Sequence, residues 1–137
     1  MKAIRSHEVG GPETLRLDEI AAPLPGKGEV VIAVKACAIN YPDGLIIRDL
    51  YQFKPPRPFA PGGEIAGVIA AVGDGVEGLA VGDRVMACTG HGGLVEQLAV
   101  DAARVFRVPD NVPLEKAASL LMTYGTTIHG LKDRGHI

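Results

Sequence analysis

This 137-residue chain contains an almost continuously apolar stretch, Glu29-Val30-Val31-Ile32-Ala33-Val34-Lys35-Ala36-Cys37-Ala38. A run rich in β-branched residues, without a polar residue at every second position, is typical of a strand covered on both faces. We therefore expect residues 29–38 to form a central strand.

Outward from this strand, short β-branched segments alternate with turn residues. The chain has 18 glycines and 10 prolines, and regular turn signals between short strands are typical of an all-β barrel or sandwich. The fold class expected is therefore mainly β. The other strands are expected at residues 2–5, 15–20, 65–72, 83–88, 94–100 and 105–108.

Helices are expected in two places. A short one is expected at residues 42–47, because Asn40 can cap it and Pro42 suits its first turn. Leu114, Ala117 and Leu121 have helical spacing, which predicts two helices over residues 113–134. A bend is expected between them, near Tyr124-Gly125.

Composition restricts the function. Hydrophobic residues make up 47% of the chain and charged residues 22%, with a net charge of −2. The chain can build a core, and its scattered basic residues argue against nucleic acid or a membrane as partner. No signal peptide or spanning segment is legible, so a cytoplasmic location is expected.

The metal-binding residue types are dispersed. Cys37 and Cys88 are far apart in sequence and are expected to be reduced thiols. The histidines show no metal-ligand spacing with each other or with cysteine, so we expect no intrinsic metal site. We expect His91, between glycines, to be exposed in a loop. The histidines are His7, His91, His129 and His136.

Residues 73–78, Gly-Asp-Gly-Val-Glu-Gly, match the letters of the dinucleotide-binding fingerprint. That motif holds a pyrophosphate at the start of a helix. Here residues 79–85 contain Gly82 and lead into another strand, so we interpret the glycines as a β-hairpin connection.

Polar residues follow the central strand at Asn40-Tyr41-Pro42-Asp43. They can form a site at the rim of the core, or Asn40 and Asp43 can simply cap and pack the turn. Glu64 precedes an apolar strand and, if buried, needs a backbone donor or an Arg side chain. We interpret it, and Glu96, as structural rather than as a general base.

Four motifs occur in a recognisable order: Asn40-Tyr41-Pro42-Asp43, Pro61-Gly62-Gly63-Glu64-Ile65-Ala66-Gly67-Val68, Val81-Gly82-Asp83-Arg84-Val85 and Gly92-Gly93-Leu94-Val95-Glu96. Because of these four motifs and their order, the chain resembles the zinc-independent NADPH:quinone oxidoreductase branch of the medium-chain dehydrogenase/reductase superfamily. The resemblance implies a GroES-like catalytic domain, a partly open β-barrel with short helices, over residues 1–112. Residues 113–137 would lead toward a Rossmann domain absent from this sequence.

The resemblance also indicates whether this chain can bind zinc. Zinc-dependent relatives carry a Cys ligand at the position of Asn40 and a His ligand at that of Gly63, and this chain has neither. Cys88 stands alone where their four-cysteine zinc lobe would be. We therefore expect no zinc and no Lewis-acid role for it.

The activity implied is hydride transfer from NADPH to quinones or conjugated C=C bonds. Asn40 and Tyr41 would line the substrate and nicotinamide pocket, Asp43 would hold the loop, and Tyr51 would form an aromatic wall. Thr126 would approach the nicotinamide carboxamide, with Tyr124 beside the cofactor. In the alternative interpretation, Thr126 only bonds its own helix backbone.

The resemblance thus implies the catalytic-domain portion of a reductase, which we expect to be inactive as an isolated chain and to form a homo-oligomer, a dimer. A free-standing GroES-like binding or oligomerisation module is the main alternative. A split enzyme with its nucleotide domain on a separate chain is another.

Overall fold

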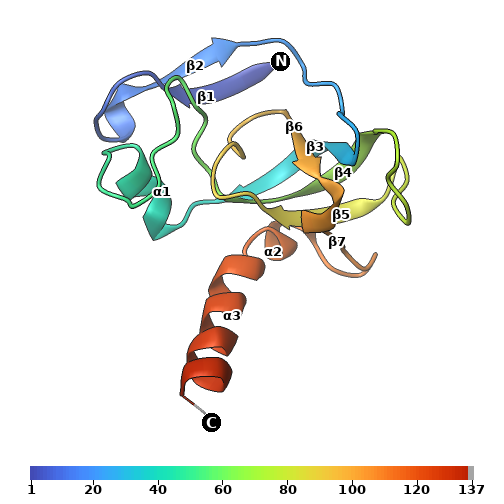
Figure 1. Cartoon of the computed structure of the whole chain (residues 1–137). Coiled ribbons are helices and arrows are strands. Elements are labelled where there is room, and N and C mark those ends of the chain that lie inside the picture. The colour runs from blue at the N-terminus through green and yellow to red at the C-terminus, as the bar shows by residue number, and fades with distance from the viewer. Residues whose placement is uncertain (136–137) are drawn as a thin grey trace.

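The computed structural model describes residues 1–135, which form two antiparallel sheets with short helices (Figure 1). The larger sheet has five strands in the order β6-β3-β4-β5-β7 and does not close on itself. A two-stranded sheet, β1-β2, lies across it. This confirms the expected mainly β, partly open architecture. The strands are β1 (Lys2–Ser6), β2 (Leu15–Glu19), β3 (Glu29–Ala38), β4 (Glu64–Val72), β5 (Arg84–Cys88), β6 (Gln97–Asp101) and β7 (Val105–Arg107).

Strand β3 has the bounds predicted from the sequence, but the strand at the middle of the sheet is β4. Residues Val30–Ile32 are buried, whereas Lys35 is exposed. The reason is that β6 pairs with β3 only over Glu29–Ala33, so burial on both faces holds for the first half of β3 only.

The main core lies on one face of the large sheet. It consists of side chains at alternate positions of neighbouring strands, which point to the same side. They are Val30, Ile32, Ile65, Ile69, Val85, Ala87 and Val100. The opposite face of β4 packs against the helical segment through Ala66, Ala117 and Ala118, so β4 is covered on both sides.

Most strands differ from the sequence prediction by one residue at one end. The exception is β6, predicted to begin at residue 94, which begins at Gln97. Gly93 N and Leu94 N donate to the carbonyls of Gly62 and Pro61 instead. Residues 94–96 also bond to β1, since Ile4 N donates to Leu94 O and Glu96 N donates to Lys2 O. This segment therefore bridges to the small sheet before β6 begins.

The glycine-rich segment 73–78 connects β4 to β5, which pair antiparallel. Gly75 and Gly78 have positive φ values of 78° and 75°, a conformation that suits glycine in tight turns. The interpretation as a hairpin connection is therefore confirmed.

The helices are α1 (Tyr41–Ile46), α2 (Leu114–Ala117) and α3 (Leu121–Ile128), with 3₁₀ turns at Pro12–Thr14 and Ala102–Arg104. Helix α1 begins one residue earlier than expected. Helix α3 continues as a π-helical stretch over His129–Arg134 and points away from the sheets (Figure 1). Within residues 1–135, no helix is long and apolar enough to cross a membrane.

The predicted bend near Tyr124-Gly125 is wrong. The helix runs through both residues, and the break lies at residues 118–120, between α2 and α3. Ala118 is buried against the sheet, and Leu120 N bonds the carbonyl of Ala117, three residues back. A tightened turn of this kind ends a helix, and an exposed glycine inside α3 costs too little to break it.

Candidate functional site

The candidate site begins where β3 ends and α1 starts. Asn40 and Asp43 form a capping box, in which Asn40 N donates to Asp43 Oδ2 at 2.8 Å. Asp43 Oδ1 accepts from Gly62 N at 2.9 Å, and the carboxylate is buried. Asp43 therefore ties α1 to the loop that precedes β4.

Glu64, at the start of β4, is fully buried with a relative exposure of 0%. Its Oε2 accepts from Asn40 Nδ2 at 3.3 Å, and its Oε1 accepts from Met122 N at 3.0 Å. A buried carboxylate needs such donors, and one is a backbone N–H, as expected. The other is the Asn40 amide rather than an arginine. Glu64 therefore joins the start of α1, strand β4 and the first turn of α3 at one point.

Cys37 lies under two glycines of the neighbouring loops. A Cβ at Gly62 or Gly93 would stand 2.5 or 2.8 Å from Cys37 Sγ. Burial first, and then the negative charge of Asp43, raises the pKa of the Cys37 thiol to about 11. The thiol is therefore neutral at neutral pH and is a poor nucleophile or metal ligand there.

Gly63 faces the loop after β5. A Cβ at this position would lie 3.1 Å from the backbone of Gly90, and Gly63 O accepts hydrogen bonds from Thr89 N and Gly90 N. The close approach leaves little room for a side chain at position 63. Among residues 1–135, His, Cys, Asp and Glu side chains gather in no group of three that could hold a metal ion.

Asn40 also lines a hollow of about 410 Å³ beside α1. Tyr41, which is 81% exposed, lies in its wall together with Arg48. Tyr51 does not line this hollow. It packs against Ile46 of α1 and its neighbours.

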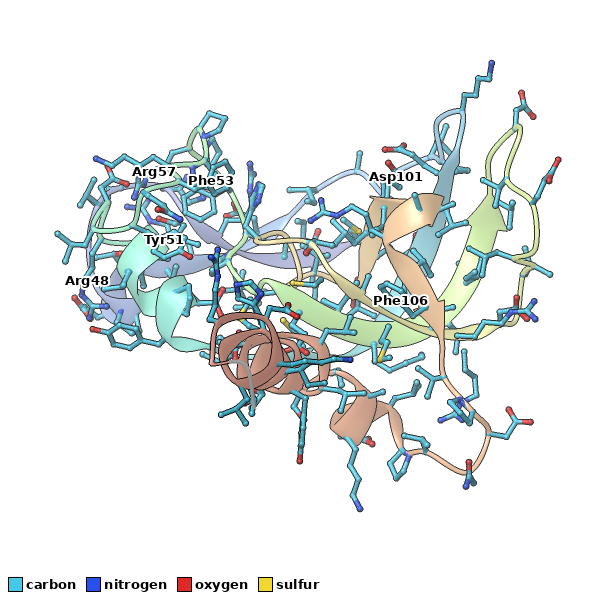
Figure 2. All side chains as sticks on the ribbon, turned by 60° about the horizontal axis from the view of Figure 1, so that its bottom comes forward. Arg48, Tyr51, Phe53, Arg57, Asp101 and Phe106 are labelled. Carbon is cyan, nitrogen blue, oxygen red and sulfur yellow. The ribbon has the colours of Figure 1, made fainter. Side chains whose placement is uncertain are left out.

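An aromatic group lies beside α1 in the loop that contains Tyr51 and Phe53 (Figure 2). The His91 ring lies 5.4 Å from Phe53 and 6.0 Å from Phe59, centroid to centroid. Arg57 stacks over Phe59 and pairs with Asp49. The expectation that His91 is exposed is wrong, because the two phenylalanines half-bury it, and this burial lowers its pKa.

Phe53 and His91 are site neighbours that the sequence analysis missed. Nothing in the sequence relates them, since they meet only when the loop after α1 folds against the loop after β5. By contrast, Asn40, Tyr41 and Asp43 are adjacent in sequence and are brought together by the start of α1.

Helix α3 carries the two residues assigned to the cofactor. Tyr124 is 60% exposed, and Thr126 is exposed on the same helix. The bond to the helix backbone considered for Thr126 is found for its neighbour, since Thr127 Oγ1 donates to Thr123 O at 2.9 Å. The first turn of α3 is held by Glu64, which also holds Asn40.

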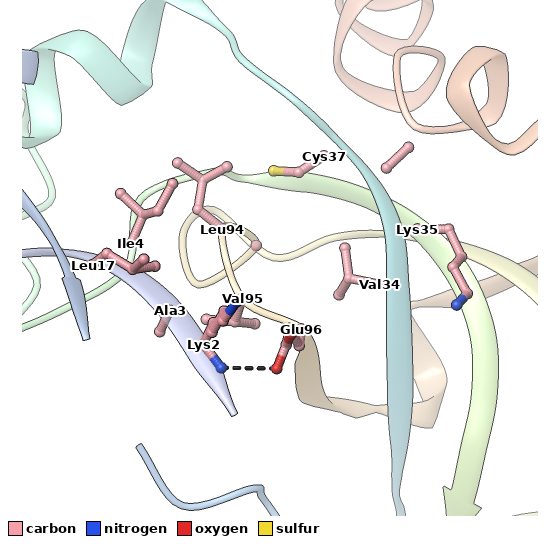
Figure 3. A pocket seen from close by; sticks show the side chains of 12 residues that line it. Lys2, Ala3, Ile4, Leu17, Val34, Lys35, Cys37, Leu94, Val95 and Glu96 are labelled. Carbon is pink, nitrogen blue, oxygen red and sulfur yellow. Dashed lines mark hydrogen bonds between the residues drawn. The ribbon is translucent and has the colours of Figure 1, made fainter. Parts of the chain in front are cut away.

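A separate apolar groove of about 340 Å³ lies between β1 and β3 (Figure 3). Ile4, Leu17, Val34 and Leu94 line it, and Lys2 N donates to Glu96 Oε2 at its edge. The uncovered apolar surface is substantial, since Leu17 is 67% exposed.

Comparison with known families gives a match to the alcohol dehydrogenase GroES-like domain over residues 26–110. The chain belongs to this family. It is 38% identical over 125 residues to quinone oxidoreductase-like protein 2 from Rattus norvegicus, a match that covers 91% of this chain and 36% of that protein.

Solved structures agree with this assignment. The human synaptic vesicle membrane protein VAT-1 homolog-like protein superposes with a TM-score of 0.96 at 33% identity, over 100% of this chain and 44% of that one. Escherichia coli quinone oxidoreductase complexed with NADPH gives 0.90 at 30% identity, over 96% and 40%. The chain therefore spans less than half the length of the GroES-like-domain proteins it matches.

Proposed function

We propose that this chain is the substrate-facing part of a zinc-independent, NADPH-dependent reductase of quinones or conjugated C=C bonds. The observation that carries the proposal is the chemistry at two positions. In zinc-dependent members of the superfamily these positions are expected to hold a Cys and a His ligand. Asn40 stands at the first with its amide bonded to Glu64, and Gly63 stands at the second against the Gly90 backbone.

NADPH would supply the hydride when bound. Among residues 1–135, we assign Thr126 and Tyr124, both exposed on α3, to its nicotinamide end. Within residues 1–135 the glycine-rich loop 73–78 leads into β5 rather than a helix, so the pyrophosphate needs a site elsewhere. We propose a nucleotide-binding domain for it, reached through residues 113–137, of which 136–137 lie outside the described residues.

In the proposed mechanism, the residues of this chain place the substrate and stabilise charge. Asn40 donates a hydrogen bond to a carbonyl oxygen, which becomes more negative as hydride arrives at the conjugated carbon. Tyr41 forms a wall of the hollow, and Tyr51 supports the aromatic loop beside it. Asp43 holds α1 against the loop before β4, which keeps Asn40 at the edge of the core.

The proposal includes a homodimer in the cytoplasm acting on a small molecule, as expected from the sequence. A free-standing binding module is the competing function. It is favoured by the exposed apolar residues of the helical segment, Leu120, Tyr124, Ile128 and Leu131.

The test is NADPH oxidation by the full-length protein with a para-quinone and an enone as acceptors. Asn40→Ala and Thr126→Ala are each expected to lower kcat/KM about tenfold, the size of one hydrogen bond lost from a transition state. Thr127→Ala is the matched control, because its hydroxyl bonds its own helix. Equal kcat/KM in all four proteins would refute the site. NADPH binding without turnover of any acceptor would favour the binding module.

A further inference from the structure

Glu64 accepts hydrogen bonds from two donors of different kinds. Met122 N is a backbone donor and cannot reverse its polarity. The Asn40 side chain is an amide, which can turn either its NH₂ or its oxygen toward a neighbour. The two carboxylate oxygens are used separately, with Oε1 accepting from Met122 and Oε2 from Asn40.

A carboxylate has no proton to donate, so both of its oxygens can only accept hydrogen bonds. With Asn40 reversed, Oδ1 would face Glu64 Oε2 inside the core, where Glu64 has 0% exposure and an unpaired charge is costly. Nδ2 must therefore point inward. The amide oxygen is then left on the side of the capping box with Asp43.

We propose that Glu64 is a positioning residue that fixes the polarity of the Asn40 amide, so that the second hydrogen of Nδ2 is the donor offered to a ligand. The part of this inference that concerns turnover rests on the proposed function. The polarity itself rests on the two hydrogen bonds of a fully buried carboxylate.

The polarity restricts the ligand. Asn40 is half-buried and lines the hollow beside α1, so the group that meets it there must be an acceptor. A carbonyl oxygen of a quinone or enone is such a group. A substrate that presents an ammonium group at that point has no acceptor to offer the Asn40 N–H. A buried mismatch of this kind disfavours binding.

Glu64→Gln tests the inference because the glutamine has the same shape and one acceptor fewer. Its oxygen must face Met122 N, which cannot reverse, so its NH₂ faces Asn40. Asn40 can then bond it only by turning its own oxygen inward. The expected result is that the Asn40 side-chain N–H signals in NMR shift and exchange faster with solvent, and that kcat/KM falls about tenfold.

The combined variant N40D/E64Q tests the hydrogen-bond polarity of the pair. The carboxylate introduced at position 40 accepts from the amide NH₂ introduced at position 64, so the buried hydrogen bond is restored with its polarity reversed. We expect the thermal midpoint to return toward that of the original protein, while kcat/KM stays low because the group facing the ligand is now an acceptor. N40D alone places two carboxylates together and is expected to be the least stable variant.

Two results would overturn the proposal. In the first, the Asn40 N–H signals and kcat/KM of E64Q are unchanged. In the second, E64Q loses kcat/KM while its Asn40 N–H signals are unchanged, which would make the role of Glu64 merely structural. If E64Q does not fold, N40D/E64Q still tests the polarity, because exchanging donor and acceptor restores the thermal midpoint only if the pair needs one of each; a midpoint that does not recover would contradict the proposal. If the original protein oxidises no NADPH, the proposed function fails and the NMR comparison alone decides the amide polarity.

Discussion

The Cys37 thiol reports on the environment between Asp43 and the glycine loops. Its pKa is raised from an ordinary 9.0 to about 11, mainly by burial. We expect alkylation of Cys37 to keep accelerating with pH beyond 9, toward an apparent pKa of about 11. The measurement is the iodoacetamide reaction rate against pH in a Cys88→Ser background, with the denatured protein as control.

The same shift links Cys37 to stability. The folded state keeps the thiol proton at a pH where the unfolded chain has lost it, so the free energy of unfolding falls as pH rises from about 9 to about 11. Cys37→Ala should remove this slope. An alkylation profile that levels off below pH 9 would contradict the described burial of Cys37.

Residue-level prediction from sequence succeeded where the partners are close in the chain. The Asn40–Asp43 capping relation follows from a spacing of three residues and is present. The partners of Glu64 lie 24 and 58 residues away, and no local pattern indicates them. His91 was misjudged for the same reason, since Phe53 and Phe59 reach it from a distant loop.

Replacing one glycine in strand β4 and one in helix α3 by alanine is expected to change the stability of the protein in opposite directions. In β4, a Cβ at Gly67 would stand 2.2 Å from Ala33 O of β3, where the β3–β4 register is irregular. Gly67→Ala should therefore lower the free energy of unfolding by about 1–3 kcal/mol, as overpacking does. In α3, nothing lies within 4 Å of a Cβ at Gly125, so Gly125→Ala should raise it by about 0.5–1 kcal/mol.

Urea unfolding monitored by circular dichroism measures both substitutions. The same methyl group is added in each substitution. Changes of opposite sign in the free energy of unfolding would therefore show that close backbone approach governs the site in the sheet and that helix propensity governs the site in α3. Equal effects would contradict the described β3–β4 contact or the continuity of α3.

Strands were predicted better than helices because their signals are local. The β-branched runs and glycine turns place strands such as β3 within a residue of their observed ends. The break between α2 and α3 depends on the packing of Ala118 against the sheet and on the hydrogen bond that Glu64 accepts from Met122 N. Neither contact is visible in the helical spacing, so the bend was placed at the glycine instead.

At the scale of the whole molecule, the described residues form an open sheet with one helix projecting from it (Figure 1). Asn40, Glu64 and Met122 meet where α1, β4 and α3 come together, and α3 presents Tyr124 and Ile128 to the outside. The mainly β class could be predicted from composition and turns, whereas the family rested on four motifs in order. The geometry linking Asn40 to α3 through Glu64 required the fold.

The measurement that tests the central claim most directly is NADPH oxidation with a quinone by full-length protein shown to contain no zinc after chelator treatment. We predict turnover that is unchanged by chelation and by added zinc, because in the proposed function Asn40 and Gly63 occupy the two positions where zinc-dependent relatives are expected to carry ligands. A zinc-free protein that turns over no quinone or enone until zinc is added would contradict the account.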